Sequence, residues 1–138
     1  MIEGGFDPPP GRARLAPVRR RLLLEPIDLA RAIISEIEDV KGEDIVLMDL
    51  RDVTLITDYF VICTGTSDRQ LDAIVERVRT NIKQKHDTIA WHVEGDGRSG
   101  WTLLDYNSVV VHVFSEELRT YYDLEGVWQD AKVLLRIQ

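Results

Sequence analysis

The residues whose types and spacing could best support ligand binding or catalysis lie where an apolar run meets the start of a predicted helix. Tyr59 to Cys63 form that run, Thr64 and Gly65 break it, and Ser67 follows at the predicted helix start. Backbone N–H groups at such a start can hold a phosphate. No G-K-[ST] follows and the G-x-G-x-x-G pattern is missing, so neither nucleotide-binding motif is present. A divergent nucleotidyltransferase using Gly65, Thr66, Ser67 and an acid such as Asp105 remains an alternative.

Other potentially reactive side chains favour structural roles. His92 and His112 fall on predicted strands, where a hydrogen-bonded, partly buried histidine is the commoner case. Cys63 lies inside an apolar run and is the only cysteine, so no disulfide can form within the chain. Three histidines and one cysteine do not favour a zinc site, and no D-x-D pair is available for magnesium. We therefore predict no metal, no cofactor and no catalytic site.

The helix after Ser67 carries the strongest helical signal in the chain. Ser67 and Gln70 have the S-x-x-Q spacing of a capping box. Apolar residues then recur at helical spacing, at Leu71, Ile74, Val75, Val78 and Ile82. The preceding strand, Tyr59 to Cys63, has no polar face, which predicts a central position in a sheet covered on both sides.

The remaining elements predict one α/β domain over residues 25–138, with a mixed sheet of about five strands flanked by helices. A 138-residue chain that is 44% hydrophobic can bury a core of this kind. We expect a helix capped by Asp28 and stopped by Gly42, and a helix capped by Ser115. The other expected elements are strands at 44–50, 88–94, 101–105 and 108–114, and a last helix at 130–135.

Residues 1–24 are expected to form a non-globular extension. They contain Pro8 to Pro10 and five arginines against Glu3 and Asp7, so they carry +3 and leave −10 for the remainder of a chain whose total is −7. We favour a plain extension over an organelle transit peptide, and the apolar run Leu22 to Leu24 is too short for a secretory signal. An RNA-binding module using Arg12 to Arg21 is a second alternative. The acidic remainder suits a basic protein partner better than a phosphate backbone.

Six segments in order resemble the ribosomal silencing factor family, also called Iojap-like proteins. Together with the first helix they cover roughly Ile27 to Trp128. The segments are KGEDIVLMDLRDV (41–53), ITDYFVICTGTSDRQ (56–70), HVEG (92–95), GWTLLDY (100–106), VVVHVF (109–114) and YYDLEGVW (121–128).

The resemblance implies a translation factor and not an enzyme. Members of the family bind the large ribosomal subunit through its protein L-fourteen and sterically obstruct joining of the small subunit, which represses translation. Their fold is similar to that of nucleotidyltransferases, without the catalytic acids. They are commonly homodimers away from the ribosome. The resemblance implies a bacterial cytoplasmic protein, or alternatively a mitochondrial or chloroplast one, with no membrane contact and little contact with nucleic acid.

The resemblance also implies a partner-binding surface built from two of the segments. Tryptophan and tyrosine are preferred at the energetic centres of interfaces, which independently favours the aromatic members of this set. The alternative is that Trp101 and Trp128 are ordinary core aromatics. The expected contact residues are Trp101, Leu103, Leu104, Asp105, Arg119, Tyr122, Asp123, Leu124 and Trp128.

Overall fold

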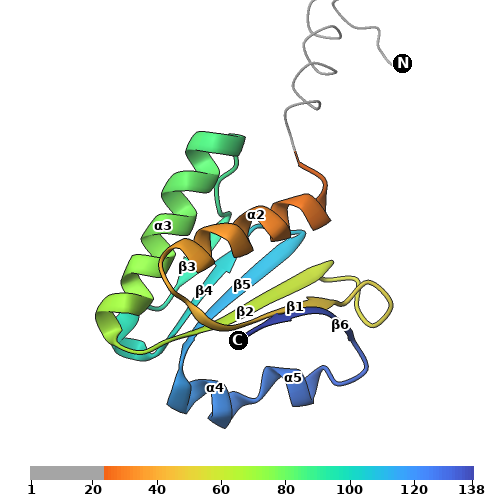
Figure 1. The fold of residues 1–138 in the computed structure, drawn as a ribbon. Coiled ribbons are helices and arrows are strands. Elements are labelled where there is room, and N and C mark those ends of the chain that lie inside the picture. The colour runs from red at the N-terminus through yellow and green to blue at the C-terminus, as the bar shows by residue number, and fades with distance from the viewer. Residues whose placement is uncertain (1–23) are drawn as a thin grey trace, which may run out of the picture.

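The computed structural model describes residues 24–138, and Figure 1 shows their arrangement. Two long helices cover one face of a mixed sheet and two short helices lie across the other. The elements are α2 (Pro26–Asp39), β1 (Glu43–Asp49), β2 (Tyr59–Gly65), α3 (Asp68–His86), β3 (His92–Glu94), the 3-10 turn η1 (Gly97–Ser99), β4 (Trp101–Asp105), β5 (Val109–Ser115), α4 (Glu116–Tyr122), α5 (Leu124–Val127) and β6 (Lys132–Ile137). Of the expected extension at residues 1–24, residues 1–23 lie outside the described residues, whereas Leu24 packs against the core.

The sheet has six strands in the order β3-β4-β5-β2-β1-β6, so the α/β class and mixed sheet are confirmed and the strand number was one too low. β2 and β5 are parallel and every other neighbouring pair is antiparallel. All seven residues of β2 are buried, as its lack of a polar face predicted. The tight hairpin between β4 and β5 turns at Asn107, whose φ of 75° is in the left-handed region that asparagine tolerates.

Two cores, one on each face of the sheet, hold the layers together. On β5, Val109, Val111 and Val113 face α2 and α3, while Val110 and Phe114 face α4 and α5. This division follows directly from the period-two alternation of side chains along a strand. The second core is smaller, and the short helices α4 and α5 cover only part of its face of the sheet. That incomplete cover leaves room for a surface site.

The start of α3 forms the predicted cap with one change in bonding. Ser67 Oγ accepts a hydrogen bond from the Gln70 N–H at 3.1 Å. The Gln70 Oε1 atom accepts from the Thr66 N–H at 2.6 Å, one residue before the position that a capping box would use. Gln70 Nε2 donates to the carbonyl of Lys41 at 2.9 Å. The cap therefore also ties α3 to the turn between α2 and β1.

Three element predictions were wrong in detail. The expected helix at 130–135 is the strand β6, because this segment pairs with the open edge of β1 and tertiary pairing overrides a weak local preference. Of the expected strand at 88–94, only His92–Glu94 pairs with β4, and Trp91 is 82% exposed. α2 begins at Pro26 after Glu25, so Asp28 lies in its first turn and is not the cap. Among residues 24–138, no helix is both long and apolar enough to cross a membrane.

Candidate partner-binding site

Strand β4 divides the expected contact residues between two faces of the sheet. Trp101, Leu103 and Asp105 are partly exposed and point to the face that carries α4 and α5, because side chains at alternate positions of a strand share a face. Leu104 is fully buried on the opposite face, in the core under α2 and α3. It cannot contact a partner without unfolding the sheet. Its inclusion in the contact set is corrected here, since the same alternation that joins the other three residues separates Leu104 from them.

Trp101 lies in a stack of aromatic rings at the end of β4. Its ring is 4.9 Å from that of Phe114 and 4.6 Å from that of Tyr122, measured between ring centroids. Gly100, with a φ of 79°, leads into the strand, and a Cβ there would lie 2.9 Å from Leu118 Cδ1 on α4. The glycine thus allows α4 to approach Trp101 closely. Trp101 is half-buried and not a simple core residue.

His112 lies beside Trp101 on the neighbouring strand β5 and is 4% exposed. Its Nδ1 atom accepts a hydrogen bond from Trp101 Nε1 at 3.2 Å. Burial lowers the pKa of the imidazole to about 4, so the ring is neutral near pH 7. The ring of Phe60 lies 4.5 Å away, edge-on. The buried, hydrogen-bonded histidine expected from the sequence is confirmed for His112, whereas His92 is exposed and pairs with Glu94 at 2.6 Å.

Two adjoining grooves open on this face and share Leu103 in their walls. The first, which we call the Tyr122 groove, has a volume of about 320 Å³ and is lined by Glu94, Gly95, Ser99, Trp101, Leu103, Leu118 and Tyr122. The second, which we call the Trp128 groove, has a volume of about 310 Å³ and is lined by Thr54, Ile56, Thr57, Phe60, Leu103, Asp105, Val110, His112 and Trp128. Within residues 24–138, their only ionisable lining groups besides tyrosine and histidine are the carboxylates of Glu94 and Asp105.

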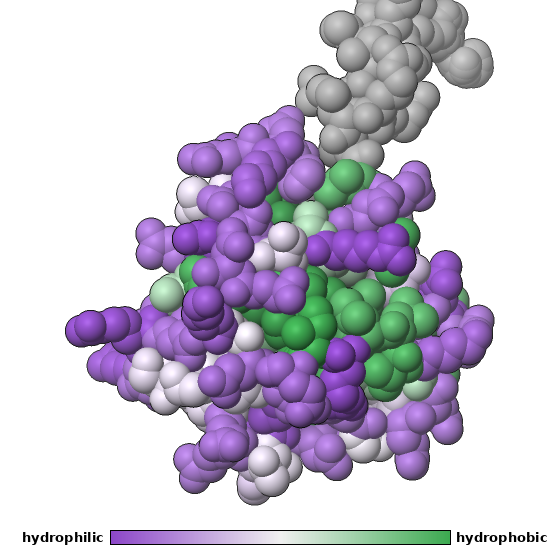
Figure 2. Space-filling model, viewed as in Figure 1, coloured by the Kyte–Doolittle hydropathy of each residue, from purple (hydrophilic) through white to green (hydrophobic). Residues whose placement is uncertain are grey.

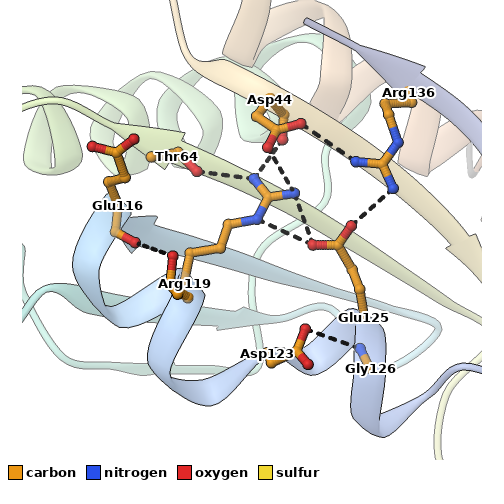
Figure 3. Close-up of polar contacts among 9 residues, drawn as sticks. Asp44, Thr64, Glu116, Arg119, Asp123, Glu125, Gly126 and Arg136 are labelled. Carbon is orange, nitrogen blue, oxygen red and sulfur yellow. Dashed lines mark hydrogen bonds and ion pairs between the residues drawn. The ribbon is translucent and has the colours of Figure 1, made fainter.

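Arg119 does not face outward with the other expected contact residues. Figure 3 shows its guanidinium between the sheet and α5. It is 9% exposed, donates to Thr64 Oγ1 at 2.9 Å and to the carbonyl oxygen of Asp44, and pairs with Glu125 at 3.1 Å. Arg136 completes the cluster through Glu125 at 2.9 Å. Arg119 therefore acts inside the fold by fixing α4 and α5 on β1 and β2, and its assignment as a contact residue is corrected.

The carboxylate of Glu125 remains charged because of the two arginines. Burial alone would raise its pKa, but hydrogen bonds and charge from Arg136 and Arg119 outweigh burial and lower the pKa. This ion cluster sets the position of α5, which ends at Val127 and is followed directly by Trp128. Trp128 in turn lies 5.8 Å from the Phe60 ring and forms one wall of the Trp128 groove. The ion cluster, which lies inside the fold, thus fixes the helix that positions Trp128 in the wall of the groove.

The other expected contact residues occupy α4 and α5. Tyr122 is 42% exposed beside Trp101, and Trp128 is half-buried. Leu124 packs partly into the second core. Asp123 is exposed, and its Oδ1 atom accepts from the Gly126 N–H at 3.2 Å, so it caps α5.

The expected contact set missed several residues that line the Trp128 groove, among them Ile56 and Thr57. Ile56 and its neighbour Leu55 are 82% and 101% exposed in the loop between β1 and β2. Two adjacent aliphatic residues in a loop rich in Asp and Thr could have indicated an exposed apolar contact from the sequence alone. Thr57, by contrast, is buried under the same groove and carries no distinguishing pattern in the sequence.

The turn at Gly65 does not assemble a nucleotide site with Asp105. Gly65 pairs with Ser115 at one end of β5, whereas Asp105 pairs with Val110 five residues earlier on the same strand. A cavity of about 210 Å³ does adjoin Gly65 and Ser67, but it is lined by the carboxylates of Glu43, Asp68 and Glu116 and, among the described residues, by no Lys or Arg. Such a lining repels a phosphate. Cys63 is buried nearby, and burial raises the pKa of its thiol to about 12.

Comparisons with known proteins agree with this architecture. The model of the family described as "Ribosomal silencing factor during starvation" matches residues 24–138, including the last ten residues, which the resemblance had not covered. The ribosomal silencing factor of Halalkalibacterium halodurans is 35% identical over 75% of this chain and 88% of that protein. The Bacillus subtilis factor is 38% identical over 68% of this chain and 79% of its own length.

More distant organisms and solved structures give the same result. The chloroplastic protein Iojap of Arabidopsis thaliana is 34% identical over 78% of this chain, which spans 44% of that protein. A crystal structure of a Chromobacterium violaceum protein superposes with a TM-score of 0.73 at 32% identity, covering 77% of this chain and 88% of that one. Since a family model matches all of the described residues and relatives above 30% identity are matched over most of their length, this chain belongs to the ribosomal silencing factor family.

Proposed function

We propose that this protein binds the large ribosomal subunit through ribosomal protein L-fourteen and sterically blocks association with the small subunit, which represses translation. One observation carries the proposal: an open apolar face with stacked aromatic rings, lined by carboxylates and, among residues 24–138, by no Lys or Arg. Aromatic anchors in such a face provide binding energy. The carboxylates and the net charge of −7 attract a basic partner.

The proposed mechanism is steric and needs no catalysis. A bound domain occupies the surface that the small subunit would otherwise contact, so joining stops for as long as the complex lasts. The contact set is Trp101, Leu103, Asp105, Tyr122, Asp123, Leu124 and Trp128, with Arg119 holding the surface in place from inside the fold.

The enzymatic alternative has less support because its residues are apart in the fold. Asp105 is distant from Gly65 along β5, and Ser67 Oγ is already used as a helix cap. We expect titration calorimetry with ATP, CTP and Mg²⁺ to give no specific binding. Micromolar affinity that is lost in Ser67→Ala would favour the enzyme instead.

The RNA-binding alternative uses Arg12 to Arg21, which lie outside the described residues. Deletion of residues 1–23 tests it directly. We expect ribosome binding to persist with an unchanged dependence on salt. A large loss of affinity with a reduced salt slope would assign the contact to a basic arm, because each phosphate contact adds to that slope.

We further propose that the free protein is a homodimer and that it acts in the bacterial cytoplasm, as the family resemblance implies. Figure 2 shows apolar residues gathered on the front face between α2 and the two short helices, where β6 lies. β6 is an edge strand of the sheet and exposes Val133, Leu134 and Leu135. An edge of this kind readily pairs with a second copy.

Co-sedimentation with purified subunits tests the binding step. The protein should pellet with large subunits and remain in the supernatant with small subunits at equal concentration. Equal association with both subunits, or with neither, would contradict the proposal.

A further inference from the structure

Two residues that line the Trp128 groove each carry a buried polar atom without a partner among residues 24–138. His112 Nε2 and Thr57 Oγ1 each have no hydrogen-bond partner among residues 24–138, although both residues line this groove. His112 is 4% exposed and Thr57 is 6% exposed. Buried polar groups are nearly always paired, because leaving one unpaired costs free energy. These two atoms indicate that a ligand completes the site.

The hydrogen bond from Trp101 fixes which atom of His112 carries the proton. An indole N–H can only donate, so His112 Nδ1 must be the acceptor in their 3.2 Å contact. A neutral imidazole then carries its single proton on Nε2. A residue that lines this largely apolar groove therefore carries one oriented hydrogen-bond donor, which calls for an acceptor on the ligand.

The surrounding charges decide what kind of acceptor fits. Asp105 lines the Trp128 groove and Glu94 lines the adjoining Tyr122 groove, while within the described part of the chain neither lining contains Lys or Arg. A carboxylate or phosphate would be repelled by Asp105 and left without a countercharge. An uncharged carbonyl has no such penalty, and positive side chains next to it would be attracted.

We propose that the Trp128 groove binds one apolar side chain of a basic protein segment and that His112 Nε2–H donates a hydrogen bond to a backbone carbonyl of that segment. The inference rests on the proposed function, because the segment belongs to the large-subunit partner. Thr57 Oγ1 pairs with the same segment. Trp101 has a second role here, since its N–H holds the His112 ring in the tautomer that can donate.

A matched pair of substitutions at His112 separates its two hydrogen bonds, the one that Nε2–H donates to the ligand and the one that Nδ1 accepts from Trp101. Asparagine places its amide near Nδ1, so His112→Asn keeps the acceptor for Trp101 and removes the outward donor. Glutamine reaches the position of Nε2, so His112→Gln keeps the donor and gives up the Trp101 contact. Val110→Phe fills the groove. Affinity for isolated large subunits is the readout, and circular dichroism checks that each variant is folded.

We expect His112→Asn to weaken binding about tenfold and Val110→Phe to weaken it further, while His112→Gln stays within about threefold of wild type. If wild type binds and all three folded variants match it, the groove is not used and this inference is wrong, although the proposed function stands. If Val110→Phe converts a dimer to monomers in sedimentation equilibrium, the occupant is a second copy and the inference is likewise wrong.

A titration without ribosomes tests the inference separately from the proposed function. It uses only the wild-type protein, so it also tests the inference if a variant does not fold. The probes are the capped peptides acetyl-Lys-Leu-Lys-amide and acetyl-Glu-Leu-Glu-amide, observed through the imidazole nitrogens of His112 by NMR. The basic peptide should shift the Nε2 signal and the acidic peptide should not. No shift, or equal shifts, would overturn the inference, whether or not large subunits bind.

Discussion

Trp101 on β4 and His112 on β5 are diagonal neighbours, since Trp101 pairs with Phe114 and His112 with Leu103, and the indole N–H of Trp101 donates to His112 Nδ1 at 3.2 Å. The pair connects an exposed aromatic surface to the buried floor of the Trp128 groove. This hydrogen bond fixes the tautomer of the histidine, while ring contacts with Phe114 and Tyr122 also hold the tryptophan. The proposed binding surface is in this sense organised before any partner arrives, which reduces the entropic cost of binding.

Arg119→Met should destabilise the fold by about 2 kcal/mol or more, because Glu125 and the Thr64 hydroxyl lose a buried partner. Chemical denaturation measures the change in the free energy of unfolding. Arg69→Met, at an exposed position of α3, is the matched control and should change it by less than about 0.5 kcal/mol. Equal stabilities of the two variants would show that the ion cluster does not hold α4 and α5.

The stability of the protein should decrease below about pH 4.5 partly because of Glu36 on α2. Burial raises the pKa of this carboxyl, but hydrogen bonds from Lys85 and Asn81 and the charges of Lys85 and Arg77 outweigh burial and bring it below its ordinary value of 4.5. A lowered folded-state pKa gives stability that is present above 4.5 and is lost as the pH falls through the folded value.

Glu36→Gln should therefore lower stability at pH 7 and flatten its dependence on pH between about pH 5 and pH 3. Melting temperatures across this range provide the measurement, with the exposed Glu76→Gln as control. A wild-type slope that persists in Glu36→Gln would assign the acid sensitivity to other carboxyls.

Leu134→Lys should convert the proposed homodimer into monomers without unfolding it. Leu134 is 46% exposed on the edge strand β6, so a lysine there keeps its charge in water in the monomer but is unfavourable in a strand-to-strand contact. Sedimentation velocity reports the change. Ile89→Lys, at another exposed aliphatic position, should leave the dimer intact. A dimer that survives Leu134→Lys lies on a different surface.

The local sequence pattern was enough to predict those features of the fold and the site that depend on neighbouring residues in the chain. Period-two alternation places Trp101, Leu103 and Asp105 on one face of β4, and it also places Leu104 on the opposite face. Arg119 was misassigned because its partners Asp44 and Thr64 are 75 and 55 residues away, so its burial is a tertiary property. The strand β6 was missed for the same reason, since its pairing partner β1 begins at Glu43.

We propose that the protein blocks subunit joining by binding through the face that carries Trp101, Leu103 and Asp105. Light scattering of reassociating subunits tests this most directly. Wild-type protein that is added to large subunits before small subunits should reduce the increase in light scattering that subunit joining produces. Trp101→Ala with Asp105→Lys should restore it, because the variant loses an aromatic anchor worth about 2 kcal/mol and gains repulsion from a basic partner. Trp91→Ala with Glu76→Lys makes the same chemical changes at exposed positions outside both grooves and should inhibit like wild type. Full inhibition by the folded Trp101 and Asp105 variant would contradict the account.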